Sequence, residues 1–413
     1  MRKRRNSYTV YIIMICMIVL ALFYESFQPR NIETVTLISG VGLERGENKR
    51  VKMTIQMIKP MKGDAGSSTS SCLIISGEGD TVAEASENII LKTGSMLFWA
   101  HCSIILLNSE FAADENVMPH LDMFFRSSNF RNTASVIVCD ESPEEIFNAN
   151  TVFESISAFG IQRLLDDQDY ESNSVYMSLK KFVKNYYMLS SSSVVAGIKT
   201  SEVEENSSDS SNGGEKNNEN VKMIELSPCA IMKKGKFISY LSDSEFDGYK
   251  WLSDTMSAKI ETIDDVNVES ENNEPNSFGI SLFSANSKLE PAFEDGQYIL
   301  RVKISVKAQF ISVENELQSR NISAYKLERR FDEYKSLISA GIEKDIDSTW
   351  QKMVQTESDF CNIQDLFYSK YGNEWKNNRP ESDGEMLSDI KLDYNIDVNV
   401  VSGGLNKRFK ISQ

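Results

Sequence analysis

The chain has 413 residues, a formal net charge of −16 and a sequence pI of about 4.8. This length suffices for two or three domains. The acidic charge argues against a nucleic-acid partner, because phosphates attract Lys and Arg. Only two histidines occur, His101 and His120, so imidazole-based catalysis has few candidates.

The N-terminus carries a membrane-targeting signal. Basic residues at positions 2–5 precede an uncharged apolar run from Tyr8 to Tyr24. A helix of this length is near the short end of what crosses a bilayer core of about 30 Å. The basic side stays in the cytoplasm, which places the rest of the chain outside. A cleaved signal peptide is the competing interpretation, but the bulky residues 22–26 suit a peptidase poorly. We therefore predict a retained single-pass anchor within residues 1–25.

The five cysteines beyond this anchor show no metal or disulfide pattern. They are widely spaced and form no CxxC pair: Cys72, Cys102, Cys139, Cys229 and Cys361. An odd, scattered set is not a disulfide framework. We expect free thiols that are buried and therefore inert.

Residues 26–199 are predicted to form an α/β region, because apolar strands alternate with helical segments. Asp80-Thr81 and Ser142 stand where helix caps are expected. The expected strands are 34–43, 51–58, 72–76, 103–108 and 134–139, and the expected helices are 82–92, 117–126, one that begins at Pro143, 153–166 and 176–188.

Residues 200–221 differ in composition from both neighbouring regions. Ser, Asn, Glu, Gly and Lys dominate, and few side chains are available to bury. Such a composition is typical of a disordered linker or insertion.

Residues 222–289 are predicted to contain a hairpin followed by a helix. The hairpin turns at residues 233–236, and Asp243 or Ser244 is expected to cap a helix that reaches Trp251 and Leu252.

Residues 290–413 are predicted to form a C-terminal α+β domain. Residues 298–308 and 390–400 alternate as strands do, and 362–371 indicates a short helix. A long amphipathic helix is expected over 322–354. Its apolar stripe is Leu327, Phe331, Tyr334, Ile338, Ile342, Ile346, Trp350 and Met353. The whole chain is thus expected to be α+β, with two or three mixed domains of antiparallel or mixed sheets behind one transmembrane helix.

Five short segments occur in the order found in one protein family. They are Ser39-Gly40-Val41-Gly42-Leu43-Glu44, Ser76-Gly77-Glu78-Gly79, Phe98-Trp99-Ala100-His101, Lys234-Gly235-Lys236 before Trp251-Leu252, and Tyr371-Gly372-Asn373-Glu374-Trp375. In these features the chain resembles the Ger(x)C spore germination proteins, the C subunits of germinant receptors, over nearly the whole ectodomain. The resemblance implies a non-catalytic subunit, required for nutrient-triggered germination, on the outer face of the spore inner membrane. It also implies integral membrane A and B type receptor subunits as partners, and no cofactor.

One position departs from the family pattern. The family's lipidated Cys falls near Ser26 here, with Phe27 where Trp is usual. Serine cannot carry the thioether lipid, so the resemblance implies a relative that uses a transmembrane helix instead.

Three groups of residues invite a functional interpretation, and for each a structural role is favoured. His101 and Cys102 would point to opposite faces of a strand and could not form a dyad. Asp166, Asp167 and Asp169 lack the Gly of a Ca²⁺ loop. Residues 77–79 lack the Lys-Ser/Thr ending of a phosphate loop. We therefore predict no catalytic, cofactor-binding or metal-binding residue. A membrane-anchored extracytoplasmic enzyme and a solute-binding protein remain the alternatives.

Overall fold

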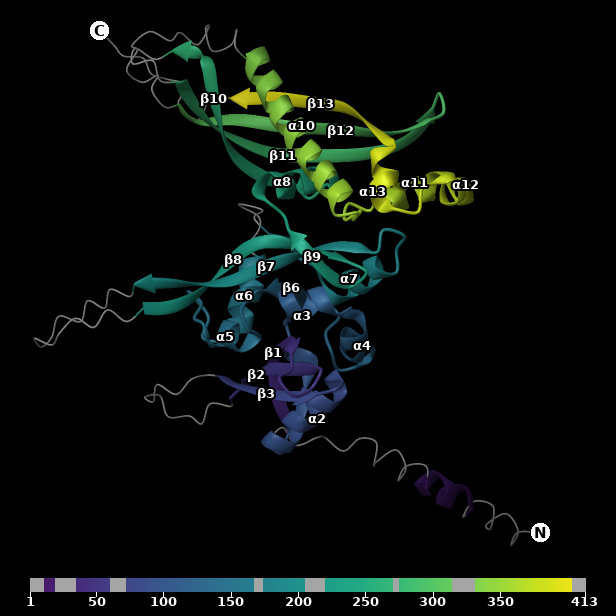
Figure 1. The fold of residues 1–413 in the computed structure, drawn as a ribbon. Coiled ribbons are helices and arrows are strands. Elements are labelled where there is room, and N and C mark those ends of the chain that lie inside the picture. Colours follow the sequence, from purple (N-terminus) through teal and green to yellow (C-terminus); the bar gives the residue numbers. More distant parts are fainter. Residues whose placement is uncertain are drawn as a thin grey trace, which may run out of the picture.

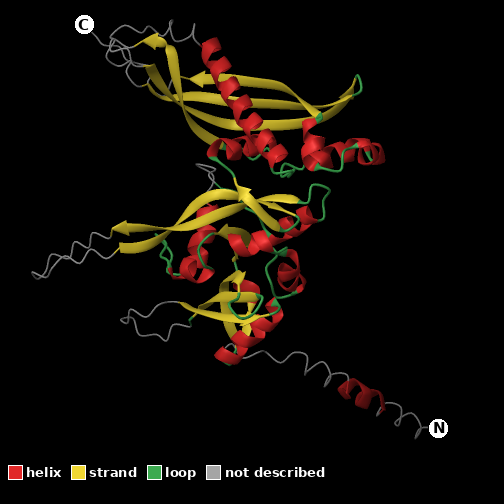
Figure 2. Cartoon of the chain, in the orientation of Figure 1, coloured by secondary structure: helices red, strands yellow, loops and turns green. Residues whose placement is uncertain are grey.

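A computed structural model describes residues 11–18, 35–59, 72–166, 174–204, 220–269, 275–313 and 331–402 (Figure 1). Two β-sheets lie one beyond the other, and helices cover them (Figure 2). Residues 11–18 are helical, and the rest of the predicted anchor lies outside the described residues. Among the helices within these ranges, none has both the length and the apolar character needed to span a membrane.

The first sheet has nine strands. Its mixed arrangement agrees with the predicted antiparallel or mixed sheets. Strands β1, β5, β6 and β7 run parallel at its centre, and antiparallel strands flank them on both sides. The short β4 pairs with the start of β1. The strands are β1 (Val35–Arg45), β2 (Val51–Ile58), β3 (Cys72–Gly79), β4 (Met96–Phe98), β5 (Ile104–Asn108), β6 (Ser135–Cys139), β7 (Ser192–Glu204), β8 (Asn220–Lys233) and β9 (Lys236–Tyr240).

Helices cover both faces of this sheet, which explains why its central strands are apolar throughout. On β5, Ile105 and Leu107 face one core, whereas Ile104 and Leu106 face another. Thr81 caps α2 by accepting a hydrogen bond from the Glu84 amide, as predicted. The helical segments are α2 (Val82–Thr93), η2 (Trp99–His101), α3 (Ser109–Asp114), α4 (Met118–Arg126), α5 (Pro143–Asn148), α6 (Ser157–Asp166) and α7 (Leu179–Tyr186).

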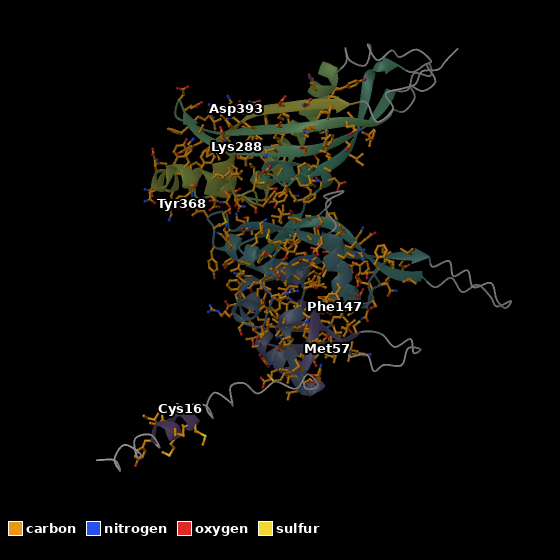
Figure 3. All side chains as sticks on the ribbon, turned by 180° about the vertical axis from the view of Figure 1, so that it is seen from behind. Cys16, Met57, Phe147, Lys288, Tyr368 and Asp393 are labelled. Carbon is orange, nitrogen blue, oxygen red and sulfur yellow. The ribbon has the colours of Figure 1, made fainter. Side chains whose placement is uncertain are left out.

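The second sheet has four strands in the order β10-β11-β12-β13, and its last pair is parallel. Leu300, Val302 and Ile304 of β12 point into the core beneath the helices. Lys303 and Arg301 alternate with them on the outer face, which also carries Lys288 and Asp393 (Figure 3). The elements are α8 (Asp243–Leu252), β10 (Ala258–Glu269), β11 (Pro275–Glu294), β12 (Gln297–Val313), α10 (Phe331–Gln355), α11 (Ile363–Tyr371), α12 (Asn373–Asn378), α13 (Asp383–Ser388) and β13 (Ile390–Ser402).

Helix α10 confirms the predicted apolar stripe over its described length. Six of the predicted residues are buried: Tyr334, Ile338, Ile342, Ile346, Trp350 and Met353. Residues 322–330 and the Phe331 side chain lie outside what the structure describes. The stripe belongs to a core that includes β12, so this helix covers the second sheet as expected.

The predicted boundaries in the middle of the chain need correction. Strands β7 and β8 extend into both edges of the predicted linker, where Thr200 pairs with Ile224 and Val203 with Val221. Backbone pairing in a long hairpin ladder outweighs the polar composition at these edges. The predicted region 222–289 is divided, because β8 and β9 belong to the first sheet and β10 and β11 to the second. Residues 205–219 lie outside the described residues.

Helix α8 joins the two halves by packing closely on α10. A Cβ atom at Gly248 would lie 2.1 Å from both the Asp345 carbonyl oxygen and Thr349 Oγ1. Only glycine therefore fits at this crossing. Thr349 Oγ1 also donates a hydrogen bond to the Glu245 carbonyl oxygen at 2.7 Å. One continuous core then runs from β7 and β8 across α8 to α10 and the second sheet.

A polar contact ties the same two halves beside this core. The Asp365 carboxylate accepts backbone hydrogen bonds from Leu189 and Ser190, at 3.1 and 3.2 Å. Ser190 Oγ also lies 2.7 Å from Asn362 Oδ1. Because buried polar groups must be hydrogen-bonded, these contacts favour one relative placement of the two sheets.

Asp359 is a fully buried carboxyl next to that contact. Burial raises its pKa to about 7, although backbone N–H bonds from Gln364 and Ile363 act in the opposite direction. The nearby Asp383 and Asp365 raise the pKa further. Asp359 therefore binds its proton more tightly in the folded chain than in the unfolded chain.

Replacing Ile338 with Asp should lower the free energy of unfolding by more than about 2 kcal/mol, because it places a charge inside a packed core. Leu337 is 41% exposed on the same helix, so Leu337→Asp is the matched control. It should lower the free energy of unfolding by less than about 1 kcal/mol. Denaturant unfolding of the purified variants measures both. Equal losses would contradict the assigned packing of α10.

Asp359 should make stability fall as the pH rises from about 4 to about 7. The folded state holds the extra proton in this window, because the pKa is raised from 3.8 to about 7, so raising the pH favours unfolding. The Asp359→Asn variant lacks this contribution. As the pH rises, the free energy of unfolding of the wild type should therefore fall relative to that of the variant. Thermal unfolding of both proteins across this range measures the difference. A difference that does not change with pH would exclude the assignment.

Candidate functional site

His101 and Cys102 do not form a catalytic pair. The strand expected to carry them begins only at Ile104, and His101 lies in the turn η2. Its exposed ring lies 6.1 Å from that of Phe98. Cys102 is buried and its thiol donates to the Ile104 carbonyl oxygen at 3.4 Å. Burial raises the pKa of this thiol, so it is a poor nucleophile.

Gly77 and Gly79 allow strand β3 to approach helix α2. A Cβ at Gly77 would lie 2.6 Å from the Ala85 carbonyl oxygen, and one at Gly79 would lie 2.5 Å from the Ala85 nitrogen. Between them, the Glu78 carboxylate accepts N–H bonds from Glu47 and Asn48. This segment therefore serves packing and a turn, and its negative charge would repel a phosphate.

The acidic group near residue 166 is only partly described. Asp166 ends α6 and accepts a hydrogen bond from Gln162 at 2.8 Å. Asp167 and Asp169 lie outside the described residues. Across the described ranges, no three His, Cys, Asp or Glu side chains are grouped so that they could hold a metal ion.

A cluster of four charged side chains lies where the two sheets meet, and we call it the junction quartet. Asp247 contacts Lys250 at 2.7 Å and Lys259 at 2.9 Å. Lys259 also contacts Asp345 at 2.9 Å. Lys250 is only 5% exposed. Two negative and two positive charges balance in this largely buried set. Removing one partner would typically lower the free energy of unfolding by about 3–5 kcal/mol.

Helix capping positions this quartet. Ser242 and Glu245 form a capping box at the start of α8, one residue earlier than the cap predicted at Asp243 or Ser244. Ser244 Oγ then donates to Asp345 Oδ1 at 2.8 Å, which connects the first turn of α8 to α10. The quartet thus depends on the same α8–α10 contact that Gly248 allows.

A cavity of about 570 Å³ opens beside the junction quartet, between β8, α8 and β10. The charged groups in its wall are Asp243 and three members of the quartet, Asp247, Lys250 and Lys259. The apolar part of the wall is formed by Leu226, Pro228, Leu241, Phe246 and Ile260. Cys229 also lines the cavity, but burial raises its pKa to about 12, so it stays a thiol at neutral pH. The cavity can accommodate a small molecule, but this thiol supplies no nucleophile.

Sequence reasoning missed this site. Asp247 and Lys250 show the spacing of a helical ion pair, which was the one available signal. Lys259 and Asp345 come from a strand and a distant helix, so nothing in their spacing indicates that they meet.

Two family models match the chain in succession. The model described as "Spore germination protein N-terminal domain" matches residues 28–200. The model described as "Spore germination B3/ GerAC like, C-terminal" matches residues 228–404. Together they cover most of the chain and both sheets.

Curated relatives come from Bacillus subtilis (strain 168). Spore germination protein KC is 21% identical over 388 residues, which is 92% of each chain. Spore germination protein A3 is 26% identical over 147 residues, covering 35% of this chain and 39% of the relative.

A solved structure has the same fold. The crystal structure of the GerBC protein matches with a TM-score of 0.51 and 15% identity, covering 88% of this chain and 97% of GerBC. This likeness concerns the fold alone. Because both family models match the chain, one after the other, the chain belongs to the Ger(x)C family of spore germination proteins.

Proposed function

We propose that this chain is the C subunit of a spore germinant receptor and is required for nutrient-triggered germination. The observation that carries the proposal is the ordered match of both family models over 28–200 and 228–404. The relative KC, a spore germination protein, supports it over nearly the full length. In this role the chain acts beside integral membrane A and B type subunits.

The proposal includes a membrane anchor within residues 1–25, with the rest of the chain on the outer face of the spore inner membrane. Four basic residues precede the apolar run from Tyr8 to Tyr24, and this charge distribution orients single-span proteins. The described part of the run supports this role, because residues 11–18 are helical and their side chains are exposed.

The proposed role is non-catalytic. His101 lies in the turn η2 beside the buried Cys102, and burial raises the pKa of the Cys102, Cys139 and Cys361 thiols. The junction quartet and the continuous core favour a rigid two-sheet body instead, which suits a subunit that presents fixed surfaces to partners.

A second candidate function is binding of a small solute, and the cavity beside the junction quartet favours it. Its wall combines carboxylates and ammonium groups with apolar side chains. A small zwitterion with an apolar part would match both kinds of surface.

The receptor proposal predicts two outcomes for a tagged chain purified from spore membranes and one for spores that lack the chain. Residues 1–25 should still be present by N-terminal sequencing, two integral membrane proteins should co-purify, and deletion of the chain should abolish the nutrient response. His101→Gln is the control variant, and spores that carry it should germinate like wild-type spores. A mature N-terminus near Ser26 would refute the anchor, and an unaffected nutrient response would refute the receptor role.

Solute binding predicts that leucine, as a probe zwitterion, raises the melting temperature of the purified chain. At 100 times the dissociation constant the stabilisation should reach about 2.7 kcal/mol. Asp243→Asn should abolish this shift, because Asp243 lines the cavity. Asp389→Asn is the control, because Asp389 does not line this cavity. No shift at millimolar leucine would remove leucine-like solutes as ligands.

A further inference from the structure

The start of β1 and the whole of β4 form a small apolar face. The two strands are parallel, with Val35 opposite Met96 and Leu37 opposite Phe98. Directly opposed residues point to the same side of a sheet. Val35, Leu37, Met96 and Phe98 therefore share one face, which we call the β1–β4 apolar face.

This face points away from the core of the first sheet. Leu97, which lies between Met96 and Phe98, packs against that core. Side chains alternate along a strand, so its two neighbours point the other way. None of the four is buried, and Met96 is 56% exposed. Within the described ranges, none of the three buried clusters is lined by these four side chains.

The turn before β4 directly precedes Met96 of this face and follows a helix end that carries a further exposed apolar side chain. Leu91, near the end of α2, is 75% exposed. Helix α2 ends at Gly94, whose φ is +66°, and a Cβ there would meet nothing within 4 Å. The turn thus projects from the body, with an exposed aliphatic side chain on each side of it.

The position of this face in the chain suggests what covers it. Val35 is the first described residue after the proposed anchor, which ends at Tyr24 or shortly after. Ten residues, 25–34, connect the two and can span at most about 33–36 Å. The β1–β4 apolar face therefore stays within reach of the bilayer surface. Figure 1 shows the C-terminal sheet and α10 at the other end of the body.

We propose that the β1–β4 apolar face and Leu91 rest in the interfacial layer of the bilayer that holds the anchor. This inference relies on the anchor of the proposed function. The chain is acidic overall, so attraction to anionic lipid does not drive the contact. Apolar burial drives it, and the tether supplies a high effective concentration, so a weak contact suffices. Such a contact would orient the two-sheet body relative to the membrane.

The test uses the full chain in vesicles of phosphatidylcholine and phosphatidylglycerol, with spin-labelled lipids as quenchers. Single cysteines at 91 or 96 carry an environment-sensitive fluorophore, in a background with Cys16→Ser and Cys72→Ser. The four remaining cysteines are buried. Ile311→Cys is the matched control, because Ile311 is 52% exposed on the distant second sheet. A chain labelled at its natural Cys16 reports the anchor separately.

The proposal expects strong lipid quenching and a blue shift at 91 and 96, approaching those at Cys16, and neither effect at 311. Phe98→Asp should reduce the quenching at 96 while the quenching at Cys16 is unchanged. Quenching at Cys16 but not at 91 and 96 would overturn this inference and leave the anchor intact. That result would also follow if residues 25–34 or a partner protein covered the face. Absence of quenching at Cys16 would instead refute the anchor, and the inference with it.

Discussion

The close crossing of α8 and α10 is the contact on which the rest of the structure depends. Helix α8 follows β9 of the first sheet, whereas α10 covers the second, so their packing joins the two halves. The crossing is possible because residue 248 is glycine. It brings Asp345 to Lys259 and sets one wall of the cavity beside the junction quartet. Separating these helices would expose core and leave buried charges without partners.

This arrangement supports a rigid body in which the two sheets keep one relative placement. The Asp365 carboxylate binds two backbone amides across the junction, and one core continues beneath it. In the proposed receptor role, a rigid body of this kind would hold partner surfaces at a fixed distance from the membrane. The outer face of the second sheet is charged and therefore suited to water. Hydrogen bonds from Lys288 and Lys303 lower the pKa of Glu290 to about 2, so this carboxylate stays ionised there.

The periodic spacing of apolar residues predicted individual strands and helices well. The alternation from Tyr298 to Ala308 indicated β12, and the apolar stripe around Ile338 indicated α10, because each period follows directly from backbone geometry. Strand β11, from Pro275 to Glu294, was missed, since Ser, Asn and Gly interrupt its alternation. Its pairing with β12 along most of its length compensates for that weak pattern.

The sequence by itself determined most of the element types, the mixed α+β class and the family resemblance, because these depend on neighbouring residues and their order. The prediction of buried free thiols is confirmed for Cys102, Cys139, Cys229 and Cys361, but it is wrong for Cys72, which is only partly buried. Only the tertiary structure decided that β8 and β9 belong with the N-terminal strands, that Gly248 lies at a helix crossing, and that Lys259 meets Asp345. It also decided which side of β4 faces away from the core. Each of these depends on contacts between residues far apart in the chain, and one sequence carries no signal for such distances.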